Sequence, residues 1–134
     1  MLLGQKPERS VWDNRLSKEE EKNDLVKTIR QFDVWIVEFD RAINTEIKKS
    51  RPAVVVSNNI INDLYATVIV APLTTTVRNY PSRIDTDFEN RGGQIATDQL
   101  KCFDKTRLKK KIGTISKPEQ DDLIEILSFI FQPE

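Results

Sequence analysis

A chain of 134 residues is long enough for one domain that buries roughly two thirds of the surface its unfolded form exposes. Lysine plus arginine and aspartate plus glutamate both number 21, so net charge indicates no partner, and a nucleic-acid site would have to come from local clustering. The single cysteine excludes an internal disulfide, and the absence of histidine removes the commonest general base and metal ligand.

The sequence carries no targeting signal. No apolar run approaches the roughly 20 residues that a membrane-spanning helix needs. The first residues lack the uninterrupted apolar core of a signal peptide, and a single cysteine fits a reducing compartment. We therefore expect a cytoplasmic protein with no membrane association.

The N-terminal segment differs in composition from the rest of the chain. Residues 1–16 mix glycine, proline and charges without periodicity, which is typical of a flexible arm. Ser17 and Glu20 form a capping box, which predicts a short helix with a thin apolar stripe. We therefore divide the chain into an arm with a short helix, residues 1–30, and a folded domain, residues 31–134.

From residue 33 onward the sequence is rich in β-branched and aromatic residues separated by turn formers, which is typical of short strands. We predict strands over 33–39, 52–57, 66–71, 83–86, 94–97, 99–103 and 112–115, with 94–103 forming either one strand or two joined by a bulge. Pro52 is expected in the first position of its strand and Pro72 at the end of the next, because proline lacks the N–H that a ladder needs. The asparagines at 58, 59 and 62 are expected to form a turn.

The clearest predicted element is a C-terminal helix. Ser116 and Glu119 form a capping box, and Pro118 stands in the first turn, where proline is tolerated. Apolar residues then repeat at helical spacing from 123 to 131, and they make a face wide enough to be buried both in the domain and against a second subunit. Short strands followed by one strong helix predict an α+β, mainly β fold, a small and strongly bent antiparallel sheet or barrel.

Polar residues gather where the predicted strands begin and end, and they form the candidate site: Glu46, Arg51, Thr74, Asp98 and Gln99. Arg51 ends a basic loop where the chain enters a buried strand, so it has a rigid base behind it and solvent in front. The plainer interpretation is a solvated surface arginine beside a core strand. The sequence contains no glycine-rich phosphate loop, no metal-ligand set and no Ser-His-Asp arrangement.

Cations and aromatic residues surround these candidates along the chain. They are Lys48, Lys49, Arg78, Lys101, Lys105, Tyr80 and Phe103. Cations that neutralise phosphates, mixed with rings on which bases stack, indicate binding of single-stranded nucleic acid. The alternatives are that the charges form solvated faces, that the rings belong to the core, and that Cys102 is a small buried hydrophobe.

Several motifs occur in the order found in one known family. They are Asp-Val-Trp-Ile-Val-Glu-Phe-Asp at 33–40, the run from Glu46 to Ser57 containing Arg-Pro-Ala-Val-Val-Val-Ser, Thr-Val-Ile-Val-Ala-Pro-Leu-Thr at 67–74, Asp98-Gln99, and Asp104 to Leu108 followed by Lys111-Ile112-Gly113. Over residues 31–131 the chain resembles the MazF/PemK (Kid-like) toxins of toxin–antitoxin pairs.

This resemblance implies an SH3-like antiparallel β-barrel, of the kind seen in PemK and CcdB toxins, that forms a homodimer. It implies sequence-selective cleavage of single-stranded RNA, commonly mRNA, without metal or other cofactor, and a cognate antitoxin whose tail fills the RNA groove. By position, Arg51 and Thr74 match the catalytic pair, while Glu46 and Gln99 match positions that support the site and Asp98 matches an aspartate of the Kid branch. The expected RNA contacts are Lys48, Lys49, Thr75, Arg78, Tyr80 and Lys101.

Two departures from the family pattern matter. Phe32 stands where the family usually has glycine, so the start of the first strand is open to a different shape. Thr45 and Ala96 stand where the Kid branch has histidine and arginine, which favours the arginine–threonine version of the site.

The expected chemistry is attack of a ribose 2′-OH on the adjacent phosphate, giving a 2′,3′-cyclic phosphate and a 5′-hydroxyl. A fixed arginine fork and a threonine hydroxyl stabilise the charge that develops on the phosphate oxygens. The general base stays open between Glu46 and Arg51, since arginine, with a pKa above about 12, is a poor base. Two other functions also stay open: an inactive relative that binds only antitoxin or RNA, and a CcdB-like poison of DNA gyrase.

Overall fold

The computed structural model describes residues 27–39 and 50–134. The predicted arm and the start of the predicted N-terminal helix lie outside these ranges, as do Glu46, Lys48 and Lys49 of the candidate site. The described residues form seven strands: β1 (Asp33–Glu38), β2 (Ser50–Val55), β3 (Thr67–Thr74), β4 (Arg83–Thr86), β5 (Gly93–Ala96), β6 (Lys101–Asp104) and β7 (Leu108–Thr114). They also form two helices, α3 (Asn59–Leu64) and α4 (Lys117–Ile130), and three 3₁₀ turns, η1 (Phe88–Asn90), η2 (Thr97–Gln99) and η3 (Lys105–Arg107).

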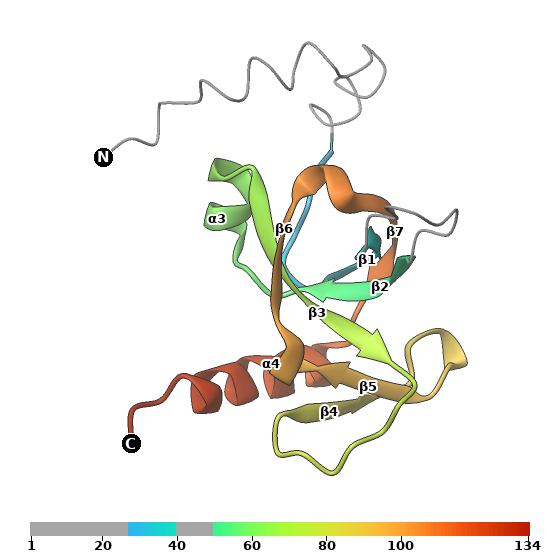
Figure 1. Ribbon diagram of the computed structural model, residues 1–134, viewed down its shortest axis with the longest axis vertical. Helices are drawn as coiled ribbons and strands as arrows, with labels where there is room; N and C mark the ends of the chain where they lie inside the picture. The colour runs from blue at the N-terminus through green and yellow to red at the C-terminus, as the bar shows by residue number, and fades with distance from the viewer. Residues whose placement is uncertain (1–26, 40–49) are drawn as a thin grey trace, which may run out of the picture.

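The strands make one antiparallel sheet in the order β4-β5-β3-β2-β1-β7, with β6 also pairing β3. Strand β3 is the hub, because β2 lies along one edge while β6 and then β5 share the other. In Figure 1 it crosses the molecule from the β1–β2–β7 end to the β4–β5 hairpin, beside which α4 lies. The predicted fold class is therefore confirmed, and the barrel takes the form of a bent sheet in which no ladder among the described residues joins β7 to β4 or β6.

Two hydrophobic cores lie on the two faces of the sheet. In β2, Ala53 and Val55 belong to one core, whereas Val54 belongs to the other, together with Leu123 of α4. Successive side chains of a strand point to opposite faces, so a strand that is buried on both faces must be apolar at every position. This explains the continuous valine run at the end of β2.

The two prolines are placed differently from the prediction. Pro52 is the third residue of β2, which begins at Ser50. Val55 directs its carbonyl to Phe32 on the β1 side, so the alternating backbone places the Pro52 nitrogen on the β3 side, where pairing begins only at Ala53. The missing N–H therefore leaves no ladder bond unmade.

Pro72 does not end β3, which continues to Thr74. On the edge of β3 away from β2, the β6 ladder reaches only Val70 and the β5 ladder begins at Leu73. Pro72 falls in this gap, so the strand tolerates a residue that cannot donate. The predicted end at Ala71 was wrong for this reason.

Helix α3 replaces the predicted turn of asparagines. Asn58 caps it by accepting a hydrogen bond from the Ile61 amide (3.0 Å), and the buried Asn62 donates to the Ser57 carbonyl (2.9 Å). Asparagine is common at both turns and N-caps, so composition alone did not distinguish the two.

The chain before and after the sheet also differs in part from the prediction. Residues 27–30, expected to end the N-terminal helix, are not helical, and Ile29 is buried in the core. The 94–103 region is two strands separated by η2, and β7 starts at Leu108, earlier than predicted, because this buried leucine anchors a run of exposed edge lysines.

Helix α4 matches its prediction, capping box included. Its apolar face is only partly covered: Leu123 is fully buried, whereas Ile124 is 43% and Phe131 70% exposed. Cys102 is exposed rather than buried, because it pairs with Ile69 on the outer face of the β3–β6 ladder. Among the described helices, none is long and apolar enough to span a bilayer.

Candidate functional site

A cleft of about 380 Å³ opens where the start of β2 and the end of β3 face the segment between β4 and β5. Its lining residues come from four parts of the chain: Arg51, Pro52, Leu73, Thr74, Thr75, Thr76, Thr86, Phe88, Glu89, Arg91, Gly93 and Ile112. The apolar lining residues Leu73, Phe88 and Ile112 are called the apolar floor below, and threonines and charged residues make up most of the remaining lining. The cleft therefore offers both a surface for a flat apolar group and groups that bind an anion.

The cleft brings together Arg51 and Thr74, two of the predicted site residues. Each lies two residues beyond the Ala53–Pro72 pair of the β2–β3 ladder, so they occupy facing positions on neighbouring strands. Arg51 is exposed, and within the described residues its side chain makes no hydrogen bond or ion pair. The Thr74 Oγ1 accepts a hydrogen bond from the Thr76 amide (3.1 Å), which leaves its O–H free to donate. A cation and a hydroxyl donor thus face the same space.

Two glycines allow the close packing around this pair. A Cβ on Gly93 would lie 2.4 Å from the Thr74 carbonyl oxygen, so only glycine lets β5 approach Thr74 this closely. A Cβ on Gly113 would lie 2.8 Å from the Phe88 ring, so this ring rests on the bare backbone of β7. Both contacts fix parts of the cleft wall.

The segment that closes the cleft was missed as part of the site. Glu89 and Arg91 line it, although the sequence predicted only a turn here. Glu89 and Asn90 adopt left-handed backbone, with φ of 54° and 60°. Such conformations cost energy and concentrate at functional sites, but short irregular segments show no periodicity by which they could be found.

Asp98 lies outside the cleft lining and pairs with Arg83. The Arg83 Nε donates to Asp98 Oδ1 (2.6 Å), and the arginine side chain is only 3% exposed. This hydrogen bond holds the pKa of Asp98 below its usual value, against the opposing effect of burial. Arg83 lies directly opposite Ala96 in the β4–β5 ladder. Asp98 therefore has as its partner an arginine of β4 that lies opposite Ala96.

A buried amide holds the loop that follows Thr74. Gln94 accepts from the Arg78 amide (2.9 Å) and donates to the Arg78 carbonyl (3.2 Å), while Arg83 donates to the Thr76 carbonyl (3.1 Å). The Arg83 guanidinium carbon also lies 5.3 Å from the centroid of the exposed Tyr80 ring. Gln94 and Arg83 are thus positioning residues that the sequence analysis did not single out.

The remaining predicted residues are dispersed. Thr75 lines the cleft, whereas the exposed side chains of Arg78, Gln99 and Lys101 do not. Phe103 packs against the core, and burial lowers the pKa of Lys105. Glu46, Lys48 and Lys49 fall outside the described residues.

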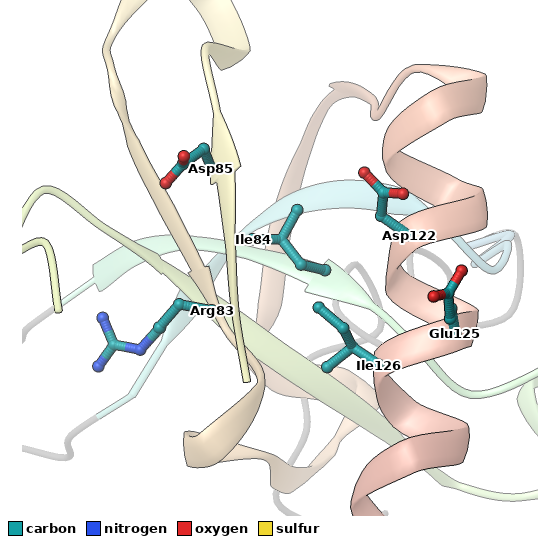
Figure 2. A pocket seen from close by; sticks show the side chains of 6 residues that line it. All are labelled: Arg83, Ile84, Asp85, Asp122, Glu125 and Ile126. Carbon is teal, nitrogen blue, oxygen red and sulfur yellow. The ribbon is translucent and has the colours of Figure 1, made fainter. Parts of the chain in front are cut away.

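A second hollow, of about 290 Å³, lies between β4 and α4 and contains none of the predicted catalytic residues. Figure 2 shows Ile84 and Ile126 facing one another across it, with Asp122 and Glu125 projecting from the helix. The Arg83 side chain points away from the helix toward its partner Asp98, so this hollow presents carboxylates without a free cation. Nothing in it matches the chemistry of the first cleft.

Residues 30–131 match the family model described as a PemK-like, MazF-like toxin of type II toxin-antitoxin system. Endoribonuclease toxin MazF of Escherichia coli (strain K12) is 32% identical over 93 residues, which cover 69% of this chain and 82% of that protein. Endoribonuclease EndoA of Bacillus subtilis (strain 168) is 27% identical over 105 residues, covering 74% and 90%.

Solved structures show the same fold at lower identity. The Mycobacterium tuberculosis toxin MazF-mt6 superposes with a TM-score of 0.64 at 22% identity, covering 76% of this chain and 98% of that one. The MazE-MazF crystal structure (Form-II) from Deinococcus radiodurans contains a chain with a TM-score of 0.69 at 15% identity, covering 81% and 99%.

Proposed function

Because the chain belongs to the PemK-like, MazF-like toxin family of type II toxin–antitoxin systems, we propose that it is an endoribonuclease that cleaves single-stranded RNA at the Arg51–Thr74 cleft. The observation that carries this proposal is that one cleft contains both residues that match the family's catalytic pair. Three relatives, EndoA, MazF9 and MazF, are named as endoribonucleases.

The reaction is an internal transfer of the phosphate. The 2′-oxygen loses its proton to the general base and forms a bond to phosphorus, while the bond from phosphorus to the 5′-oxygen breaks. The 5′-oxygen takes up a proton from solvent, so the products are a 2′,3′-cyclic phosphate and a 5′-hydroxyl. The guanidinium of Arg51 binds two phosphate oxygens through its N–H fork, and the Thr74 hydroxyl donates to a third position where charge develops. Gln99 and Asp98 support the site from outside the cleft, Asp98 through its bond to Arg83.

The general base takes the proton from the 2′-OH as the new bond forms. Glu46 is the candidate from the sequence, and Glu89 is a second carboxylate, on the wall of the cleft itself. A carboxylate accepts this proton more readily than an arginine does. Comparing Glu46→Gln with Glu89→Gln in single-turnover cleavage separates the two: the variant lacking the base should lose most of the rate and the acid limb of the pH profile.

Specificity for single-stranded RNA follows from the shape and lining of the cleft. Its apolar floor fits the face of an unstacked base, which a duplex does not offer. We assign the flanking backbone contacts to Lys48, Lys49, Thr75, Arg78, Tyr80 and Lys101. By the same resemblance to the family, we expect cleavage to be selective for sequence.

We propose further that the protein acts in the cytoplasm as a homodimer and is neutralised there by a cognate antitoxin. The exposed Ile124 and Phe131 support a subunit interface on α4. A related fold has been solved as an endoribonuclease in complex with its cognate antitoxin from mycobacterial species.

The test is cleavage of a mixed pool of RNA by purified protein in the presence of EDTA. Within the described residues, no three carboxylate or cysteine side chains are grouped so as to hold a metal ion. We expect the protein to cleave single strands without metal and to leave the same sequence in a duplex uncut. End-group analysis should find cyclic phosphates. A strict need for a divalent metal would contradict the mechanism, and no cleavage together with inhibition of gyrase supercoiling would favour a CcdB-like poison.

A further inference from the structure

A series of contacts that starts at Arg51 of the cleft joins two arginines through two phenylalanine rings. The Arg51 guanidinium carbon lies 5.4 Å from the centroid of the Phe39 ring. The Phe39 and Phe103 rings meet edge to face, with centroids 5.0 Å apart and planes at 80°. The Arg107 guanidinium carbon lies 5.1 Å from the centroid of the Phe103 ring. These four residues are called the cation–aromatic stack below.

The far end of the stack is firmly attached to the sheet. Arg107 of η3 donates through Nη1 to the carbonyls of Glu38 (3.1 Å) and Phe39 (2.7 Å), where β1 ends. Both phenylalanines are partly buried against the core that contains Val37, Ala53 and Val55. The ring beneath Arg51 is therefore held by its own backbone, by a second ring and by the core.

The register explains why Phe39 reaches Arg51. Arg51 pairs with Val37 in the β1–β2 ladder, and Phe39 follows Val37 by two residues, so it lies diagonally across from Arg51 on the same face. Aromatic side chains are long enough to contact such diagonal neighbours. Phe39 is absent from the cleft lining, which Arg51 reaches.

Stacking on a ring leaves the guanidinium free for a ligand. A cation–π contact draws the positive charge toward the ring and occupies none of the five N–H donors. Within the described residues none of these donors has a hydrogen-bond partner, and the side chain is exposed to solvent. An exposed arginine without such a ring would lose more rotamer freedom on binding a phosphate.

We propose that Phe39 is a positioning residue that holds the Arg51 fork in its catalytic orientation, and that Phe103 and Arg107 keep Phe39 in place. The inference rests on the proposed function, since it assigns Arg51 to the transition state. A fork that is already oriented speeds the chemical step and contributes less to binding the substrate. Removing the ring should therefore lower the saturating rate more than it weakens RNA binding.

The test compares Phe39→Leu, which keeps an apolar side chain but loses the ring, with Phe39→Tyr, which keeps the ring. We expect Phe39→Leu to reduce the single-turnover rate at saturating RNA about tenfold or more, with a change of about twofold or less in affinity, and Phe39→Tyr to restore the rate. In an Arg51→Ala background, Phe39→Leu should have no further effect on the rate. Trp35→Leu is the control, because Trp35 is a large ring of the same core but is not one of the four residues of the stack; this variant should lower the melting temperature and leave the saturating rate unchanged.

A second readout does not require activity. In the protein labelled with nitrogen-15, the Arg51 side-chain N–H signal should carry a ring-current shift that disappears in Phe39→Leu and persists in Phe39→Tyr. If this shift is present but no RNA is cleaved, the proposed ribonuclease function is wrong, whereas the contact between Phe39 and Arg51 is supported. If Phe39→Leu weakens RNA binding to the same extent with or without Arg51, the ring contacts RNA directly and the proposal is wrong. A loss of rate no larger than that of Trp35→Leu would also overturn it.

Discussion

At the scale of single residues, Phe32 occupies a backbone conformation that favours glycine, with a φ of 76°. Its amide donates to the Val55 carbonyl (2.7 Å) and its carbonyl accepts from the Ile115 amide (3.1 Å), so this one residue connects β2 to the segment before α4. Phe32 thus adopts a left-handed conformation although it is not glycine. The phenylalanine ring packs against the core, which offsets part of the backbone strain.

The strain at Phe32 can be measured by a matched pair of truncations. Phe32→Ala and Phe32→Gly both remove the ring, and they differ only in whether a Cβ remains at a positive φ. We expect Phe32→Gly to be the more stable of the two by about 1 kcal/mol in urea unfolding. Equal stability of the two variants would show that the left-handed backbone carries no cost here.

Gly93 tests whether the position of Thr74 matters for activity. Gly93→Ala places a methyl group against the Thr74 backbone, so one strand must move, and we expect a loss of stability of about 1–3 kcal/mol and a fall in the cleavage rate of about tenfold or more. Gly92→Ala is the control, because nothing lies within 4 Å of its added carbon. A normal cleavage rate in Gly93→Ala would mean that Thr74 tolerates displacement and is not a catalytic residue.

At the scale of elements, the hairpin of β4 and β5 positions the loop that follows Thr74. Arg83 of β4 donates to the Thr76 carbonyl of this loop, and Gln94 of β5 accepts from the Arg78 amide. Asp98 in η2 accepts a hydrogen bond from Arg83. Glu119 at the start of α4 accepts from Thr86, a residue of the cleft wall. Burial opposes the charge on Glu119, but hydrogen bonds from Thr86 and Ser116 outweigh it and leave its pKa lowered. The cleft wall is thus connected to the helix.

The Arg83–Asp98 pair predicts how stability depends on pH. The pKa of Asp98 is lowered mainly by its hydrogen bond from Arg83, so the pair's contribution is full above the unfolded pKa of about 3.9 and is lost as pH falls through the folded pKa. Asp98→Asn should cost about 1–3 kcal/mol at neutral pH, and its difference from the unmodified protein should shrink below about pH 4 in urea titrations. Asp121→Asn breaks an exposed pair and should cost at most about 0.5 kcal/mol. A difference for Asp98→Asn that stays constant down to pH 2 would contradict the assignment.

The sequence predicted elements wherever a local pattern was strong. Runs rich in β-branched and aromatic residues located β1 and most of β3, and the Ser116 capping box located α4. It failed where the outcome depends on distant partners. Pro72 continues β3 only because of a gap between two ladders, and the wall containing Glu89 depends on the bare backbone of Gly93 and Gly113. The proximity of Arg51 and Thr74 was predicted from the family resemblance, because the sequence of one strand does not determine its register against its neighbour.

At the scale of the whole molecule, the sheet has apolar side chains on both faces, and α4 covers one of the two cores only in part. Ile124 and Phe131 are seven residues apart, so they lie two turns apart along one strip of the helix beside Leu127. We propose that a second copy of the chain covers this strip. Leu127 lies on the same strip but also packs in the core, so a charge there would disturb folding as well as assembly.

The proposed dimer is tested with charges on that strip. Ile124→Asp and Phe131→Asp should give folded monomers in sedimentation experiments at micromolar concentration, because a buried carboxylate is costly at an interface. Ile60→Asp and Leu64→Asp place the same charge on the exposed face of α3 and should leave the dimer intact. A monomeric unmodified protein, or dimers in all four variants, would rule out this interface.

The central claim, that Arg51 stabilises the transition state of RNA cleavage, is tested most directly by single-turnover cleavage and binding on the same oligonucleotide, with a 2′-deoxy substitution for the binding arm. Arg51→Ala should lower the cleavage rate by a factor of about a hundred or more while binding weakens much less, and Arg51→Lys should restore little because it lacks the fork. Arg78→Ala should instead reduce affinity and lower the slope of its salt dependence by about one. If Arg51→Ala cleaves saturating RNA at the normal rate, Arg51 only binds the substrate and the mechanism is wrong.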